Sequence, residues 1–249
     1  MSASWFVTRA PRASARTRLF CFPHAGASAA VYHRWAGRLP EDIELHAAEL
    51  PGRATRIADR ALTDFDSLLS AILPALLERA GPRFALYGHS MGALMAFELA
   101  VRLQRDGHAA PACVFVSGQN APHIPITERL SEWSDEQLVA EISRLNGTSS
   151  DVLQNKAFLS HYLSIIRADL RVVESYRFRS NAPLTCPLVV FAGTEDPHLC
   201  EEGILAWTRH TSSQTIIRTR AGGHFTWWND EARIIEEISE FLKKSGEER

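Results

Sequence analysis

A doubly wound α/β fold with a mostly parallel sheet is the fold class that this sequence predicts, and three observations predict it. Short apolar runs alternate with amphipathic helical segments over most of the 249 residues, as in consecutive strand–helix–strand units. The apolar runs, such as residues 112–117, fit buried strands of a sheet covered on both faces. The length suits one large domain and is short for two. We therefore expect a single domain over residues 1–249.

The elements of the first half follow in chain order from these patterns. Short apolar runs predict strands, the first of them at a sheet edge, at residues 5–8, 18–22, 43–50, 84–87 and 112–117. Helical period predicts helices at about 29–39, at 64–77 with Thr63 or Asp64 as N-cap, and from 93 towards Gly107. A polar stretch before the second helix is interpreted as a solvated loop; it contains Arg53, Arg56 and Arg60.

The alternation of strands and helices stops between about residues 119 and 179. The capping box Ser134-Asp135-Glu136-Gln137 opens one helix, and apolar residues at helical spacing mark a second, longer helix up to Val173. A helical insertion of this length favours a lid over a functional site, with a plain core extension as the alternative. The sheet then resumes with a strand at 188–192, a helix near 201–210, a strand at 215–219 and a closing helix through Leu242.

The stretch Gly88-His89-Ser90-Met91-Gly92 joins an apolar run to a helical segment, and its G-x-S-x-G pattern in that context is a nucleophile elbow. The turn is so tight that the positions two residues either side of the serine must lack side chains. The start of the helix directs the Met91 N–H at any oxyanion formed beside Ser90 Oγ. Ser90 is therefore the candidate nucleophile. The alternative is a Gly-Ser turn that only reverses the chain.

A serine hydroxyl needs a base to take its proton, and that base needs an orienting acid. In this architecture the chain order is serine, acid, histidine. His224 lies in the Gly-rich loop 221–225 between the last strand and the closing helix, which makes it the candidate base. His198 and His210 precede the last strand and are expected at the surface.

Two carboxylates compete for the role of the acid. Asp196 and Glu195 directly follow the strand at 188–192, at the sheet edge where sites collect in open α/β sheets. The shorter aspartate, placed before Pro197, fits better, so Asp196 is the candidate. A solvated turn is the alternative for both residues.

A loop of small residues follows the strand at 18–22. Its sequence, Pro23-His24-Ala25-Gly26-Ala27-Ser28, lets backbone N–H groups approach a ligand closely. In the elbow architecture the second oxyanion donor comes from the loop after an early strand, and the Ala25 N–H is the candidate. His24 flanks this donor and is a candidate for substrate contact. An ordinary strand-to-helix turn is the alternative.

Composition argues against several classes of partner. The formal net charge of −2 is unlike the basic surface of a nucleic-acid-binding protein. No apolar run approaches the length of a membrane span, and no signal sequence opens the chain. Wide spacing and apolar surroundings favour reduced thiols over disulfides or a metal site for Cys21, Cys113, Cys186 and Cys200. We expect a cytoplasmic protein with no membrane, nucleic-acid or metal partner.

Five motifs stand out along the chain: Phe22-Pro23-His24-Ala25-Gly26, Leu50-Pro51-Gly52-Arg53, Gly88-His89-Ser90-Met91-Gly92, Gly193-x-x-Asp196 and Gly223-His224-Phe225. Together they resemble a type II thioesterase, a stand-alone editing hydrolase of polyketide and nonribosomal peptide synthases within the α/β-hydrolase superfamily. The resemblance covers almost the whole chain, and its first two motifs are more diagnostic than the elbow. One departure is Ala27, where the family often has a second glycine; it leaves the Ala25 donor intact and makes its loop slightly stiffer.

The resemblance implies hydrolysis of acyl groups stalled on the phosphopantetheine arm of acyl or peptidyl carrier proteins. Ser90 would attack the thioester, His224 would move the proton, and Asp196 would hold the imidazole. The amides of Ala25 and Met91 would bind the oxyanion. The lid would form the acyl chamber. The arm belongs to the substrate, so no cofactor is implied, and we expect a monomer that contacts carriers transiently.

Carrier proteins tend to be acidic, which would suit a basic docking surface. A candidate patch on or after the lid consists of Arg167, Arg171, Arg177 and Arg179. A solvated helix face is the alternative.

Two rival functions remain open on this fold. A carboxylesterase or peptidase acting on free small molecules would use the same elbow, because fold alone does not fix the substrate. A binding module that retains the elbow without catalysis is the second rival.

Overall fold

The computed structural model describes residues 4–145, 156–179 and 182–247, and within them seven strands form one sheet in the order β1-β3-β2-β4-β5-β6-β7. β1 pairs antiparallel with β3 at one edge, and all other neighbours in this sheet are parallel. The predicted mostly parallel sheet and its first edge strand are therefore confirmed. The strands are β1 (Phe6–Val7), β2 (Thr17–Phe22), β3 (Ile43–Ala48), β4 (Phe84–His89), β5 (Val114–Ser117), β6 (Leu188–Gly193) and β7 (Thr215–Arg220).

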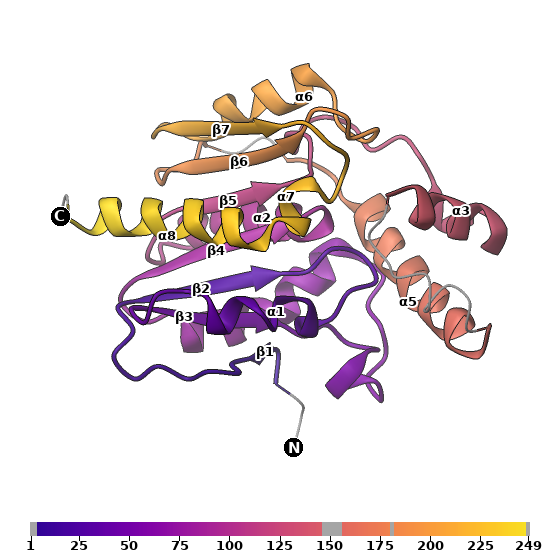
Figure 1. The fold of residues 1–249 in the computed structure, drawn as a ribbon, viewed down its shortest axis with the longest axis horizontal. Coiled ribbons are helices and arrows are strands. Elements are labelled where there is room, and N and C mark those ends of the chain that lie inside the picture. Colours follow the sequence, from indigo (N-terminus) through magenta and orange to yellow (C-terminus); the bar gives the residue numbers. More distant parts are fainter. Residues whose placement is uncertain (1–3, 146–155, 180–181, 248–249) are drawn as a thin grey trace.

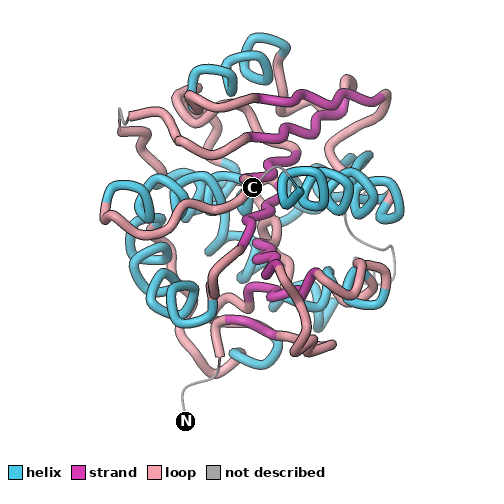
Figure 2. The backbone as a smooth tube through the Cα atoms, turned by 90° about the vertical axis from the view of Figure 1, so that its left-hand side faces the viewer, coloured by secondary structure: helices cyan, strands magenta, loops and turns pink. Residues whose placement is uncertain are grey.

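Helices lie on both sides of the sheet, as Figures 1 and 2 show. The α-helices are α1 (Phe65–Arg79), α2 (Met91–Arg105), α3 (Asp135–Leu145), α5 (Lys156–Ser175), α6 (Glu201–Leu205), α7 (Thr226–Asn229) and α8 (Glu231–Glu247). The 3₁₀ helices are η1 (Ala29–Tyr32), η2 (Trp35–Gly37), η3 (Ala54–Arg56), η4 (Leu130–Glu132) and η5 (Ala206–His210). In the described part of the chain, every helix falls short of the length or the apolar character that a membrane span requires.

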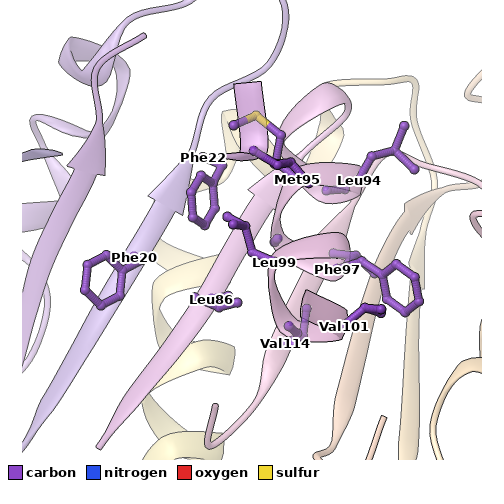
Figure 3. Close-up of a cluster of buried hydrophobic side chains, with 14 of the residues drawn as sticks. Phe20, Phe22, Leu86, Leu94, Met95, Phe97, Leu99, Val101 and Val114 are labelled. Carbon is purple, nitrogen blue, oxygen red and sulfur yellow. The ribbon is translucent and has the colours of Figure 1, made fainter. Parts of the chain in front are cut away.

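Strand β2 contributes side chains to two different cores, because successive residues of a strand point to opposite faces of the sheet. Phe20 and Phe22 are buried with side chains of α1 and α2 on one face. Figure 3 shows the side chains of α2 in this core. Leu19 and Cys21 are buried with side chains of η1, η2 and α8 on the other. This double coverage explains why residues 19–22 of β2 form a continuous apolar run in the sequence.

Two helix starts that the sequence predicts are confirmed in atomic detail. Asp64 caps α1, where its carboxylate accepts a hydrogen bond of 2.8 Å from the Ser67 N–H. At α3 the capping box is reciprocal: the Ser134 N–H donates to Gln137 Oε1 at 2.9 Å, and the Gln137 N–H donates to Ser134 Oγ at 3.3 Å. Each contact satisfies an N–H that the helix itself leaves unpaired.

The expected helix at 29–39 is wrong. The segment forms two separate 3₁₀ turns, η1 and η2, which still bury Tyr32 and Trp35. Valine, tyrosine and tryptophan have modest helix propensity, and Gly37 weakens the second turn. The Tyr32 hydroxyl donates to the Phe22 carbonyl at 2.6 Å, which fixes the first turn to the end of β2.

The solvated loop expected around Arg53, Arg56 and Arg60 is wrong for the first two residues. Arg53 and Arg56 are only 4% and 6% exposed, whereas Arg60 is exposed. The Arg56 guanidinium donates to Asp59 Oδ2 at 2.7 Å and lies over the Trp5 ring, 3.9 Å from its centroid. Buried arginines of this kind are held by specific partners, since burial of an unpaired charge is costly.

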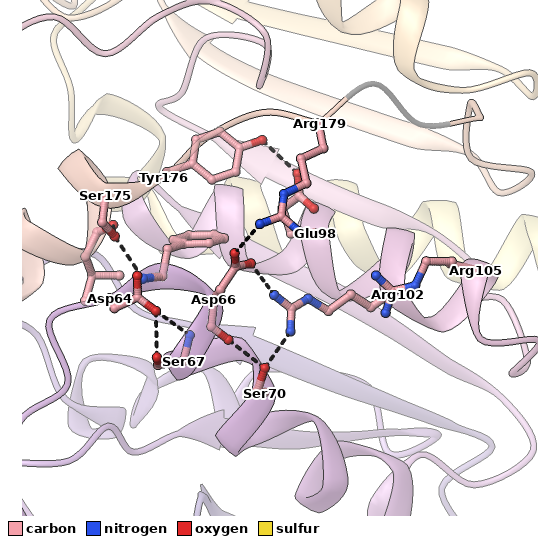
Figure 4. A network of polar contacts seen from close by, with 12 residues as sticks. Asp64, Asp66, Ser67, Ser70, Glu98, Arg102, Arg105, Ser175, Tyr176 and Arg179 are labelled. Carbon is pink, nitrogen blue, oxygen red and sulfur yellow. Dashed lines mark hydrogen bonds and ion pairs between the residues drawn. The ribbon is translucent and has the colours of Figure 1, made fainter.

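The insertion lies beyond the carboxyl ends of the parallel strands, where Figure 1 shows α3 and α5 past the arrowheads. Its end is fixed to the body of the molecule by a network of polar contacts, drawn in Figure 4. The Tyr176 hydroxyl donates to Glu98 Oε1 at 2.7 Å, and Arg179 donates to Asp66 Oδ2 at 2.9 Å. The insertion is thus anchored to α1 and α2, and its role as a lid stays a prediction.

His210 is not at the surface as expected but 8% exposed, and this prediction is wrong. Its ring packs against Phe97, Trp207 and Phe178, and its Nε2 lies 2.8 Å from His123 Nδ1. Burial, together with the neighbouring His123 and Arg209, lowers the pKa of His210 from 6.5 to about 4. The folded protein therefore favours the neutral imidazole.

Replacing His210 with glutamine should flatten the decline of stability in weak acid. Because the pKa is lower in the folded state, the unfolded chain takes up the proton first, so stability is lost as the pH falls from 6.5 towards 4. At pH 5 this loss is about 2 kcal/mol. Urea unfolding at pH 7 and pH 5 measures it, with the exposed His108→Gln as control. An equally steep pH dependence in His210→Gln contradicts the assignment.

Candidate functional site

Ser90 occupies a strained turn between β4 and α2. Its backbone has φ 55° and ψ −117°, a conformation that residues other than glycine rarely adopt. A Cβ built on Gly88 would lie 1.8 Å from the Gly92 carbonyl oxygen, and one built on Gly92 would lie 2.1 Å from the Phe22 carbonyl oxygen. Both obstacles are backbone atoms, so the turn requires glycine at these two positions. The strain is located at the residue predicted to react.

His224 and Asp196 form a buried pair at the carboxyl ends of β7 and β6. His224 Nδ1 lies 2.7 Å from Asp196 Oδ2, with side-chain exposures of 6% and 0%. The other carboxylate oxygen accepts a hydrogen bond of 2.9 Å from the His198 N–H, which fixes the orientation of the carboxyl group. Glu195, the competing acid, is exposed. The structure therefore places Asp196, and not Glu195, against the imidazole.

Ser90, His224, Ala25 and His24 line one cavity of about 390 Å³. Apolar side chains of the insertion form much of its wall, among them Ile124, Leu138, Ile142, Ile166, Leu170 and Val173. The cavity thus combines a polar end, with a hydroxyl and an imidazole, and an apolar extension. Such a shape suits a substrate with an apolar chain attached to a reactive carbonyl.

The structure places the two predicted oxyanion donors near the polar end of the cavity, where Ser90 lies. Met91 is the first residue of α2, so its N–H belongs to the group that a helix cannot bond internally. Ala25 lies in the loop after β2, on the cavity wall. We call residues 24–28 the oxyanion loop. Their role as a pair of N–H donors to a negatively charged oxygen stays a prediction.

Three imidazoles are packed together at the polar end of the cavity. The ring centroid of His89 lies 4.9 Å from that of His224 and 6.0 Å from that of His24. Burial, with His224 adding to it, lowers the pKa of His24 to about 4 and that of His89 well below its usual value. His24 and His89 are therefore neutral near pH 7, and His224 is the histidine of this group that has a carboxylate partner.

Some residues of the cavity do not belong to any local sequence pattern that identifies a functional site. Glu141 of α3 lies in the cavity wall, and its Oε1 is 2.9 Å from His198 Nε2. His198, expected at the surface, is partly buried, with its ring 5.7 Å from that of His224. The two residues are 57 positions apart in the chain, and neither belongs to a local pattern. In the described ranges, 4–145, 156–179 and 182–247, no three His, Cys, Asp or Glu residues are placed to hold a metal ion.

The chain is similar to known proteins over most of its length. The family model described as Thioesterase domain matches residues 17–244. The gramicidin S biosynthesis protein GrsT of Aneurinibacillus migulanus is 33% identical over 96% of this chain and 94% of its own length. Thioesterase PikA5 of Streptomyces venezuelae is 34% identical over 97% of this chain and 86% of its own. The type II thioesterase BorB from the borrelidin biosynthetic cluster superposes with a TM-score of 0.89 and 36% identity, covering 97% and 99% of the two chains.

Proposed function

This chain belongs to the thioesterase family, and we propose that it removes acyl groups from the phosphopantetheine arms of carrier proteins in polyketide or nonribosomal peptide biosynthesis. The family match confirms the resemblance drawn from the sequence motifs. The observation that carries the proposal is that Ser90 and His224 line the same cavity as the apolar side chains of the insertion. This arrangement accommodates both the reacting thioester and the acyl chain attached to it.

The first half of the proposed reaction transfers the acyl group to the enzyme. Ser90 Oγ attacks the thioester carbonyl while His224 takes the hydroxyl proton. Asp196 stabilises the imidazolium that forms, and the N–H groups of Ala25 and Met91 bind the oxygen of the tetrahedral intermediate. When the intermediate collapses, the C–S bond breaks and His224 returns the proton to the leaving sulfur. The products are an acyl ester of Ser90 and the free thiol of the arm.

The second half repeats these steps with water. His224 takes a proton from water as its oxygen attacks the acyl-Ser90 carbonyl, and the same two N–H groups bind the oxyanion. Collapse breaks the bond to Ser90 Oγ, which receives the proton from His224. A carboxylic acid leaves, and the serine is restored. Apart from the substrate and the attacking water, the groups that act in this scheme belong to the chain itself.

The predicted docking arginines are largely engaged within the molecule. Arg167 donates to Asp135 Oδ1 at 2.6 Å, Arg177 donates to the carbonyl of Glu174 at 2.7 Å, and Arg179 is paired with Asp66. Carrier proteins as partners follow from the proposed reaction, while these contacts support a structural role for the three side chains. We propose transient carrier contacts with a monomeric enzyme.

We also propose that the protein is cytoplasmic, because a reducing compartment keeps cysteine thiols free. The free thiols are those of Cys21, Cys113, Cys186 and Cys200.

A comparison of substrates tests this function. The enzyme should hydrolyse an acyl-loaded carrier protein with a much higher kcat/KM than it hydrolyses an aryl ester of the same acyl group. Release of the free carrier thiol, followed by mass spectrometry, provides the readout, and a panel of chain lengths defines the preferred acyl group. A strong preference for the aryl ester would favour a carboxylesterase. A serine-directed phosphonate that leaves Ser90 unmodified would favour the non-catalytic binding module.

A further inference from the structure

The Leu50-Pro51-Gly52-Arg53 motif has no role in the chemistry described so far, yet it ends in a buried ion pair. Arg53 Nη1 lies 2.5 Å from Asp169 Oδ2, and Arg53 Nη2 lies 2.6 Å from Asp169 Oδ1. The side chains are 5% and 2% exposed. Arg53 follows β3, whereas Asp169 belongs to α5 of the insertion. The pair therefore joins two segments that are 116 residues apart in sequence.

Both partners also bind the backbone of the oxyanion loop. Asp169 Oδ2 accepts a hydrogen bond of 2.7 Å from the Gly26 N–H, and Arg53 Nη1 donates one of 3.0 Å to the Ala27 carbonyl. The ion pair thus contacts the two residues that directly follow Ala25. Helix α5 also packs on the loop here, since a Cβ on Gly26 would lie 2.6 Å from Ile166 Cγ1.

These contacts fix the direction of the Ala25 N–H. This N–H shares a planar peptide group with the His24 carbonyl, so the two point in opposite directions. The His24 carbonyl accepts a hydrogen bond of 3.1 Å from the Ala27 N–H, and Ala27 is the residue whose carbonyl Arg53 holds. The next peptide group is held on both sides, because His24 Nδ1 lies 3.0 Å from the Ala25 carbonyl and the Gly26 N–H is bonded to Asp169.

We propose that Arg53 and Asp169 are positioning residues for catalysis. They direct the Ala25 N–H towards the oxyanion, and because Asp169 belongs to α5, this direction depends on how α5 packs against the oxyanion loop. A buried ion pair is in itself weak evidence for stability, because well-packed apolar residues often replace one without loss. In this pair, however, both residues also hydrogen-bond the oxyanion loop and so hold the backbone of that loop in one position. The inference rests on the proposed function, since it takes the Ala25 N–H to be an oxyanion donor.

Two matched arginine variants test the inference. Arg53→Lys keeps the charge but loses the two-pronged geometry that holds Asp169 and the Ala27 carbonyl together. Arg56→Lys is the control, because Arg56 lies in the same loop and is equally buried but bonds Asp59 and the Glu49 carbonyl instead. We expect kcat to fall about 100-fold in Arg53→Lys with KM little changed, since one misplaced oxyanion donor costs about that much. Arg56→Lys should stay within about twofold of the unmodified enzyme.

A double variant keeps the test valid if single changes impair folding. Arg53→Met with Asp169→Leu removes both charges together, so that neither is left buried alone. Active-site titration with a serine-directed phosphonate corrects each preparation for its folded fraction. Per titrated site, the double variant should show a kcat drop of about 100-fold.

Inhibitor binding distinguishes a misplaced oxyanion donor from a general disturbance of the binding site. A trifluoromethyl ketone analogue forms a tetrahedral adduct with a charged oxygen, and its Ki should rise in parallel with the fall in kcat. An unreactive thioether analogue of the substrate has no such oxygen, and its Kd should not change. Unaltered kcat and ketone Ki per titrated site in Arg53→Lys and in the double variant would overturn the inference. If the unmodified enzyme releases no acyl group from a loaded carrier protein, the proposed function itself has failed.

Discussion

Replacing Ser90 with alanine should lower kcat for an acyl-carrier substrate by about 10⁵-fold or more, the largest effect that this site predicts. Without Oγ, no acyl-enzyme can form, and the remaining oxyanion donors and His224 can assist only a direct attack by water. The backbone of the turn should be unaffected, because alanine keeps the Cβ that Ser90 already accommodates at φ 55°. Binding of the acyl carrier should therefore survive the substitution.

Mass spectrometry of the carrier protein over time measures the remaining turnover, and a binding assay with the same acyl carrier reports affinity. Ser70→Ala is the matched control, since Ser70 lies on α1 in the polar network of Figure 4 and does not line the cavity. Unchanged turnover in Ser90→Ala would exclude the proposed nucleophile. Lost carrier binding would instead show that the substitution disturbs more than the reaction.

The site could be predicted from the sequence wherever the decisive contacts are local or follow from strand order. At the elbow, the atoms that exclude a Cβ from Gly88 belong to Gly92 and Ala93, only a few positions away. Asp196 and His224 each follow a parallel strand, so the sheet itself brings both residues to one edge. Their short contact is then a consequence of topology, which the alternation of strands and helices already indicates.

The sequence-based interpretation was wrong where burial depends on distant partners. Arg53 stands in a polar stretch that resembles a solvent-exposed loop, but Asp169 on α5 provides its counter-charge. His210 stands in a segment that resembles a surface helix, but it is covered by Phe97 and Phe178 from other elements. Neither partner can be identified from neighbouring residues, because local composition contains no information on which side chains lie opposite.

Replacing Asp196 with asparagine should lower kcat by about 10⁴-fold while the fold is maintained. Asparagine has nearly the same shape, and its carbonyl oxygen can still accept the His198 N–H that Asp196 binds at 2.9 Å. Its NH₂ group would then face His224 Nδ1, which must accept a hydrogen bond instead of donating one. The proton of the neutral imidazole moves to Nε2, so that this nitrogen can no longer take the proton of Ser90.

Glu195→Gln is the matched control, since it also replaces a carboxylate with an amide. Glu195 is the exposed neighbour and the other candidate acid in the sequence. Its kcat should stay within about twofold of the unmodified enzyme, because an exposed carboxylate has only a weak, screened influence on the site. Steady-state hydrolysis of one acyl carrier by the two variants measures the difference. The reverse result, with Glu195→Gln impaired and Asp196→Asn active, would mean that the 2.7 Å contact between His224 and Asp196 does not orient the catalytic imidazole. An equal and moderate loss in both would indicate a general electrostatic effect of this loop, in which no single carboxylate fixes the tautomer of the histidine.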